Sequence, residues 1–129
     1  MDAHKIVRYW LESADKDWDV ARNLFKFKHY AYCLFFSHLA IEKLLKAVIV
    51  QSTGKHAPQI HELKKLAKLA GLKLTTAQRE YLEEITTFNI QARYDDVKQS
   101  FYKKATRAFA QKYLAITKEL MIWLKENLR

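Results

Sequence analysis

The chain has 129 residues, half of them hydrophobic, which is enough to enclose one core and too few for a second domain, so we expect residues 1–129 to form a single domain. Only two glycines and one proline occur, which excludes a fold of many strands joined by tight turns. Lys and Arg outnumber Asp and Glu by 23 to 14, and the resulting net charge of +9 favours anionic partners such as nucleotides, RNA or an acidic protein surface.

Two long helices are expected in the first half of the chain. From about residue 3 to 27, apolar residues recur every three or four positions, which predicts an amphipathic helix. Residues 30–51 are apolar on nearly every face, as in a helix that is packed on several sides. We expect this second helix to form the centre of the core.

The middle of the chain predicts a break followed by two further helices. Residues 52–58 have no periodicity and contain the only proline. A short helix is expected around Leu63, Leu66 and Leu69, with Gly71 at its C-terminal cap. Thr75 and Gln78 form a capping-box pattern that opens the next helix.

The pattern of this fourth helix fades after Phe88, so we expect the polar segment 89–96 to be a loop. A last periodic run predicts a helix over roughly 104–127. Five helices with short connections indicate an all-α fold, an up-and-down antiparallel helical bundle whose three longer helices form the main layer.

The cellular location is expected to be the cytoplasm. Cys33 is the only cysteine, which excludes a disulfide framework, and the N-terminal residues lack the apolar stretch of a signal peptide. Charged residues interrupt every apolar run before the roughly 20 residues that a membrane span requires, so no membrane association is expected.

Metal and cofactor sites are not expected. His61 and Glu62 begin an H-E-x-x-H pattern, but Lys65 occupies the position of the second histidine. The two glycines, Gly54 and Gly71, are isolated, so no glycine-rich phosphate loop exists. Phosphate recognition would have to come from side chains or from the N-terminus of a helix.

Two charged segments are the candidates for a functional site. Glu42 and Lys46 lie one helical turn apart, in the orientation that favours an ion pair. They form either a solvated helix face or, because the helix is so apolar, a pair that needs partners or lines a cleft. Arg93, followed by Tyr94, Asp95 and Asp96, offers a forked donor, an aromatic ring and acceptors, or else only a network that anchors a loop; these charged residues are candidate partners for the helix.

The chain resembles the HEPN family (higher eukaryotes and prokaryotes nucleotide-binding). The matching pieces cover nearly the whole chain in the right order. They are Trp10-x-x-x-Ala14-x-x-Asp17 with Ala21, His29-Tyr30-Ala31-Tyr32-Cys33, Ala40-Ile41-Glu42-Lys43-Leu44-Leu45-Lys46-Ala47, His61-x-Leu63-x-x-Leu66, Ala92-Arg93-Tyr94-Asp95-Asp96 and Trp123-Leu124.

The resemblance implies a helical bundle that is usually a homodimer, is often encoded beside a minimal nucleotidyltransferase, and has a cleft facing nucleotides or RNA. Many HEPN proteins are metal-independent ribonucleases that use an Arg, a following polar residue and a His four to six positions later. Arg93 and Tyr94 match the first two, but no histidine follows His61 anywhere in the chain. RNA cleavage benefits from an acid-base group that titrates near neutrality, so this absence weakens the nuclease hypothesis, although Asp95, Asp96 or Tyr102 offer substitutes.

Three hypotheses follow. The first is a non-catalytic HEPN protein that binds a nucleotide or RNA and acts with a partner nucleotidyltransferase in a toxin-antitoxin-like, two-protein system. Its expected nucleotide- and phosphate-binding residues are Arg93, Tyr94, Lys43 and Lys46, with Glu42, Asp95, Asp96 and His61 in support. The second is a divergent, metal-independent ribonuclease toxin, and the third is a dimerisation or interaction module without a ligand. The missing histidine favours a protein that is not an enzyme.

Overall fold

The computed structural model describes residues 1–93 and 95–129, and the side chains of residues 1–91 and 99–129. Within these ranges the chain forms six helices and no strand. They are α1 (Ala3–Lys26), α2 (Tyr30–Thr53), α3 (Leu63–Leu69), α4 (Thr76–Arg93), α5 (Asp95–Lys104) and α6 (Arg107–Glu126). The predicted all-α bundle is confirmed.

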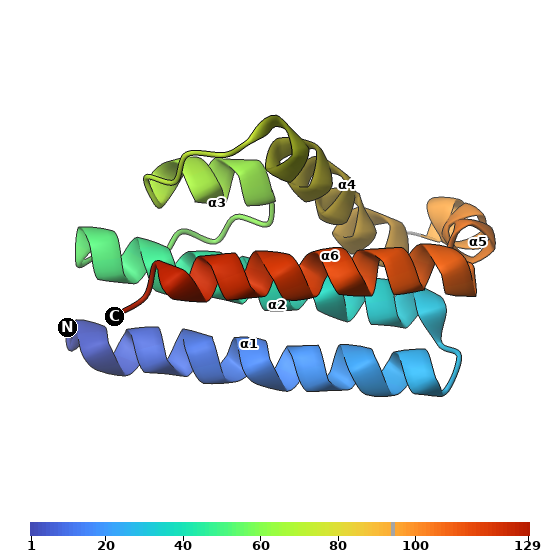
Figure 1. Cartoon of the computed structure of the whole chain (residues 1–129), viewed down its shortest axis with the longest axis horizontal. Helices are drawn as coiled ribbons and strands as arrows, with labels where there is room; N and C mark the ends of the chain where they lie inside the picture. Colours follow the sequence, from blue (N-terminus) through green and yellow to red (C-terminus); the bar gives the residue numbers. More distant parts are fainter. Residues whose placement is uncertain (94) are drawn as a thin grey trace.

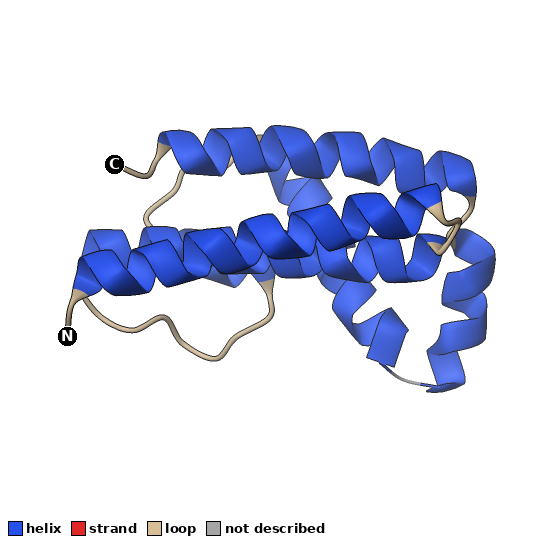
Figure 2. Cartoon of the chain, turned by 90° about the horizontal axis from the view of Figure 1, so that it is seen from below, coloured by secondary structure: helices blue, strands red, loops and turns tan. Residues whose placement is uncertain are grey.

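The three long helices α1, α2 and α6 run alongside one another over the length of the molecule, with α6 in front of α2 and α1 below both (Figure 1). The chain runs up α1, back along α2, returns through α3 and α4, and runs back along α6, so both termini lie at the same end. The shorter helices α3 and α4 lie on the side of α2 that faces away from α1 (Figure 1), and α5 lies at the end of the bundle opposite the two termini, as the turned view also shows (Figure 2).

Helix α2 is the centre of the bundle because it contacts each of the other five helices. Most of its apolar side chains are buried, which explains why its sequence lacks a polar stripe. Cys33 lies fully buried in this helix as a free thiol, and burial raises its pKa to about 12. None of the helices in the described part of the chain is long and apolar enough to cross a membrane.

The helix ends follow the predicted local chemistry. The Thr75 hydroxyl accepts a hydrogen bond from the Gln78 backbone N–H, and the Gln78 side chain accepts one from the Thr75 N–H, both at 3.0 Å. Gly71 follows α3 with a φ of 74°, a conformation that glycine adopts at no steric cost. These two ends fix the turn that sends the chain from α3 into α4.

The segment 89–96, predicted to be a loop, is the main correction. Helix α4 continues through it as far as Arg93, and α5 begins at Asp95. The sequence contains no glycine or proline here, and Gln91 and Ala92 are good helix formers, so propensity carries the helix past the point where the apolar pattern fades. Helix α5 is anchored by the fully buried Phe101, whose ring centroid lies 5.9 Å from that of Phe88.

Candidate functional site

A buried carboxylate on α2 organises the site. Glu42 is only 5% exposed, and its two oxygens bind different partners. The Lys46 ammonium donates to Glu42 Oε2 at 3.0 Å, and His61 Nδ1 lies 2.8 Å from Oε1. The ion pair predicted from the spacing is present, but it is buried, so a solvated helix face is the wrong description.

The ionised state of Glu42 follows from these contacts. Burial alone would raise the pKa of Glu42, but the hydrogen bonds from His61 and Lys46, with the charges of His38 and Lys46, outweigh it and hold the pKa below its ordinary value. Because the carboxylate is ionised, it accepts a hydrogen bond from the Nδ1–H of His61. The imidazole is therefore held in one orientation, with its Nε2 on the other edge of the ring.

His38 completes this network and was missed by the sequence analysis. Its imidazole is fully buried, and its Nε2 lies 3.0 Å from the backbone carbonyl of His61 and 3.8 Å from Glu42 Oε1. The Nε2–H donates to the carbonyl, which fixes the end of the 54–62 connection against α2. A histidine one turn before Glu42 in the most apolar helix was a signal that the sequence offered.

The two lysines predicted to bind phosphate are held differently. Lys43 turns to α1, where its ammonium lies 2.6 Å from Asp17 Oδ2 and donates to the Ser13 hydroxyl at 2.7 Å. Lys46 stays with Glu42, and its ammonium lies 5.3 Å from the centroid of the Trp10 ring. In this structure both cations already have a carboxylate partner.

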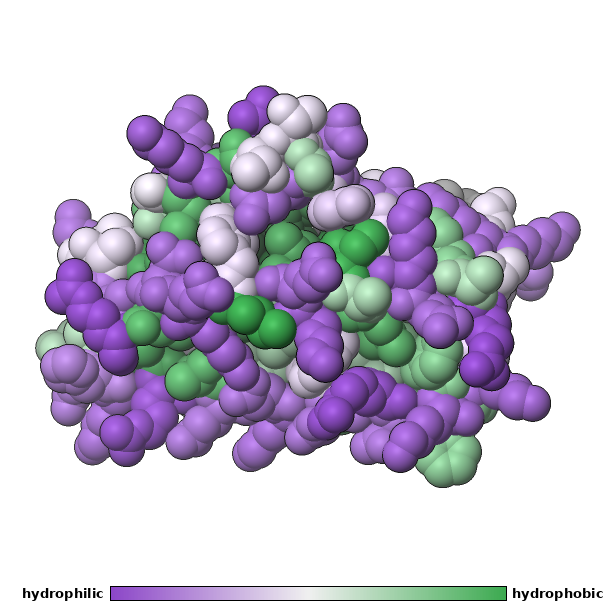
Figure 3. All heavy atoms as spheres, viewed as in Figure 1, coloured by the Kyte–Doolittle hydropathy of each residue, from purple (hydrophilic) through white to green (hydrophobic). Residues whose placement is uncertain are grey.

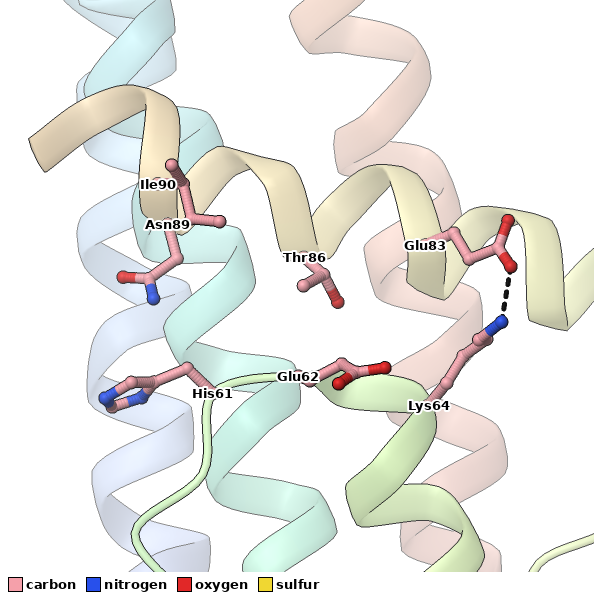
Figure 4. A pocket seen from close by; sticks show the side chains of 7 residues that line it. All are labelled: His61, Glu62, Lys64, Glu83, Thr86, Asn89 and Ile90. Carbon is pink, nitrogen blue, oxygen red and sulfur yellow. Dashed lines mark hydrogen bonds and ion pairs between the residues drawn. The ribbon is translucent and has the colours of Figure 1, made fainter. Parts of the chain in front are cut away.

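An open pocket of about 630 Å³ lies beside this network, between the start of α3 and the middle of α4. His61, Glu62 and Lys64 form one wall, and Glu83, Thr86, Asn89 and Ile90 of α4 form the other (Figure 4). The Lys64 ammonium and the Glu83 carboxylate form an ion pair across one end of it. Such a volume suits a small ligand.

Thr86 joins the two walls. Its hydroxyl donates to the Leu82 carbonyl at 2.7 Å and accepts from the Leu63 backbone N–H, the first of α3, at 3.1 Å. This contact satisfies one of the N–H groups that a helix start leaves without a partner. This hydrogen bond and the Lys64–Glu83 ion pair therefore both join α3 to α4 around the pocket.

Asn89 is the most informative residue of the pocket, and it was not predicted from the sequence as a site residue. It is 6% exposed, and its Oδ1 is buried without a hydrogen-bond partner among the described residues. Figure 4 shows its amide on the same side of the pocket as the His61 ring. Buried amides are normally paired, so an orphaned one in a pocket wall points to a ligand.

The other predicted site residues lie outside what the structure describes in detail. Arg93 ends α4 and Asp95 begins α5, but the side chains of Arg93, Asp95 and Asp96, and Tyr94 as a whole, are outside the described residues.

Among the residues that are described, no group of three or more His, Cys, Asp or Glu side chains could hold a metal ion.

The comparisons with known proteins agree with this fold. The family model of the HEPN domain matches residues 7–128. Among solved structures, the crystal structure of TT1696 from Thermus thermophilus is similar, with a TM-score of 0.80 at 22% identity over 95% of this chain and 98% of that chain. At this identity the likeness concerns the fold alone. A comparison with curated proteins gives no match.

Proposed function

Because the chain belongs to the HEPN domain family, whose members bind nucleotides or RNA, we propose that it is a non-catalytic nucleotide-binding protein whose α3–α4 pocket holds the nucleoside part of the ligand. The observation that carries the proposal is the buried Asn89 amide with its orphaned Oδ1. When the side chain turns so that Oδ1 and Nδ2 both face the pocket, a ligand edge with a donor beside an acceptor satisfies both atoms of the amide. Adenine has such an edge, and Asn pairs with it bidentately.

The rest of the pocket suits a nucleoside better than a phosphate. Its fixed charges are Lys64, Glu62 and Glu83, which sum to −1. Carboxylates accept hydrogen bonds from ribose hydroxyls but repel phosphate oxygens. Ile90, which is 52% exposed, adds apolar surface for a base.

The phosphate is assigned to the far end of α4. Arg93 is the last residue of this helix, four positions after Asn89. We propose that Arg93 donates hydrogen bonds to the phosphate, since its forked guanidinium matches phosphate geometry, and that Tyr94 stacks on the ligand. Lys46, His61 and Glu42 support the pocket wall, Asp95 and Asp96 orient the basic groups, and Lys43 becomes available only if it leaves Asp17.

The proposal extends to partners on the basis of family membership. We propose a homodimer that acts with a minimal nucleotidyltransferase in a two-protein, toxin-antitoxin-like system. Co-expression with the product of the neighbouring gene, followed by purification on a tag carried by one protein only, tests the partnership. Light scattering of the pure protein tests the dimer, and a monomer at micromolar concentration would contradict it.

The test of the pocket is a thermal melt with AMP, ATP, GTP and adenosine. A ligand that binds only the folded state at one hundred times its Kd stabilises by about 2.7 kcal/mol. Asn89→Leu removes the amide at similar volume. We expect it to weaken binding by roughly one to two orders of magnitude, the range of one bidentate pair. We also expect it to leave the unliganded protein at least as stable, because an unpaired buried oxygen is lost.

Asn23→Leu is the matched control, since Asn23 is an exposed residue of α1 outside the pocket. A wild-type melting temperature that no nucleotide or nucleoside changes would sink the proposal. Equal binding by the wild type and Asn89→Leu would move the ligand to another site.

A second function, RNA cleavage, is favoured by one specific observation. His61, half-exposed at the pocket, is oriented by the buried Glu42 carboxylate, which is the arrangement of a general base. In this second proposal, His61 takes the role of the histidine that is absent after Arg93, although it comes from another part of the chain. The test is metal-free cleavage of RNA that disappears in both His61→Asn and Arg93→Ala; RNA left intact by the wild type excludes the function.

A further inference from the structure

We propose that the basic groove beside the nucleoside pocket binds the phosphodiester backbone of a single-stranded polynucleotide, so that the natural ligand is a chain and not a mononucleotide. This inference rests on the proposed function of the pocket. The groove is a second hollow, of about 680 Å³, between α3, the turn after it and α4.

The groove concentrates positive charge. Its walls carry five cations and one carboxylate, Glu62, a net charge of +4 out of the +9 of the whole chain. The cations are Lys64, Lys65, Lys68, Lys73 and Arg79. Glu62 is the one carboxylate among the described residues that line the groove, so the field of the groove attracts a polyanion.

Most of these cations are available to a ligand. Lys64 is paired with Glu83, but the other four are exposed and form no ion pair or hydrogen bond through their side chains within the described chain. This differs from Lys43 and Lys46, which are held by carboxylates of the bundle. Cations that stay close together without partners are suited to a row of phosphates.

The groove and the pocket share a wall, because Glu62 and Lys64 line both. A mononucleotide fills one hollow of this size, not two. The pocket and the groove also differ in charge, which suits them to different parts of a ligand. The pocket, with its orphaned amide and net negative wall, suits a base and ribose, while the groove suits the phosphates that continue from it.

Apolar side chains in the groove complete the fit. Leu72 and Leu74 lie among the cations. They offer contact surface for riboses or unstacked bases, which an acidic peptide would not require. Hydrophilic side chains cover α3 at the top of the space-filling view, with apolar ones exposed between them and α1 (Figure 3).

The experiment measures the binding of fluorescent single-stranded RNA and DNA ten-mers and of AMP at several salt concentrations, for the intact chain, Asn89→Leu and two double variants. Lys65→Gln with Lys73→Gln removes two groove cations. Lys5→Gln with Lys16→Gln removes the same charge from exposed positions of α1, which lies on the opposite side of α2 (Figure 1).

We expect the groove variant to bind the ten-mers about 25-fold more weakly at 0.1 M salt, and its salt slope to fall by about 1.4, since each phosphate contact on a single strand contributes roughly 0.7 to the slope. AMP binding should be unchanged, and the control variant should resemble the wild type. The RNA and DNA arms decide whether the ribose hydroxyl contributes.

Three results would overturn the inference: unchanged ten-mer binding in the groove variant, an equal loss in the control variant, or competition by poly-glutamate as strong as by RNA. Its failure is distinguishable from that of the pocket. If the groove variant binds the ten-mers as tightly as the wild type while AMP still binds, only the polynucleotide inference is rejected. If ten-mer binding depends on the groove cations but not on Asn89, the nucleoside pocket is rejected.

Discussion

Glu42 shows how one buried charge both stabilises the bundle and prepares the site. It accepts hydrogen bonds from Lys46 and His61, so its removal leaves a lysine that is only 6% exposed without a countercharge. We expect Glu42→Gln to lower the free energy of unfolding at pH 7 by about 3–5 kcal/mol, the range for breaking a buried pair. Urea denaturation measures it, with Asp15→Asn as the control.

Asp15 is a suitable control because its ion pair with Lys125 is exposed, and such pairs contribute about 0–1 kcal/mol. The pH dependence gives a second check. The folded-state pKa of Glu42 lies below the ordinary value of 4.5, so its stabilisation is fully present above pH 4.5 and is lost as the pH falls through the folded pKa. The difference in the free energy of unfolding between the wild type and Glu42→Gln should therefore narrow below pH 4.5. A difference that stays constant with pH would contradict the conclusion that Glu42 is ionised in the folded protein.

At the scale of elements, the Thr86 hydroxyl fastens the start of α3 to α4 beside the pocket, in addition to the Lys64–Glu83 ion pair. Thr86→Val keeps the volume but removes the acceptor of the Leu63 N–H. We expect a loss of about 1–2 kcal/mol in the free energy of unfolding, because an N–H at the start of α3 loses its partner. Thr87→Val is the matched control, since the Thr87 hydroxyl donates only to Glu84 of its own helix. Equal losses in the two variants would mean that the link between the helices contributes nothing.

The elements also show what the sequence could and could not predict. The capping box at Thr75 and the glycine after α3 were predictable because these motifs are made by neighbours in the chain. Helix α5 was not predicted, because a single fully buried residue, Phe101, does not give a periodic apolar pattern. Its ring packs against Phe88, which is distant in the sequence.

For the site, the same rule holds. The Glu42–Lys46 pair follows from spacing within one helix, whereas the approach of His61 to Glu42 depends on the path of the loop between them. Asn89 could not be recognised from the sequence, because its polar side chain becomes informative only once the fold has buried it. Local rules thus predicted the helices, and tertiary contacts made the pocket.

At the scale of the molecule, stability should be uneven, and the site should lie where it is lower. Helix α2 contacts every other helix, so its amides should exchange with solvent only on global unfolding. Helix α3 has seven residues and a long connection on its N-terminal side, so it can open without the rest. We expect peptides from 40–50 to set the slowest rates in hydrogen exchange and peptides from 60–70 to exchange well before them.

A ligand that spans α3 and α4 should change this order in a specific way. Binding to the folded state slows global exchange everywhere by the same free energy, but a bound nucleotide also prevents the separate opening of α3. The protection gained by residues 60–70 should therefore exceed that gained by 40–50. Equal gains in protection for the two segments would mean that the ligand stabilises the bundle from another surface. Protection confined to α1 and α6 would place the binding site on those helices and not between α3 and α4.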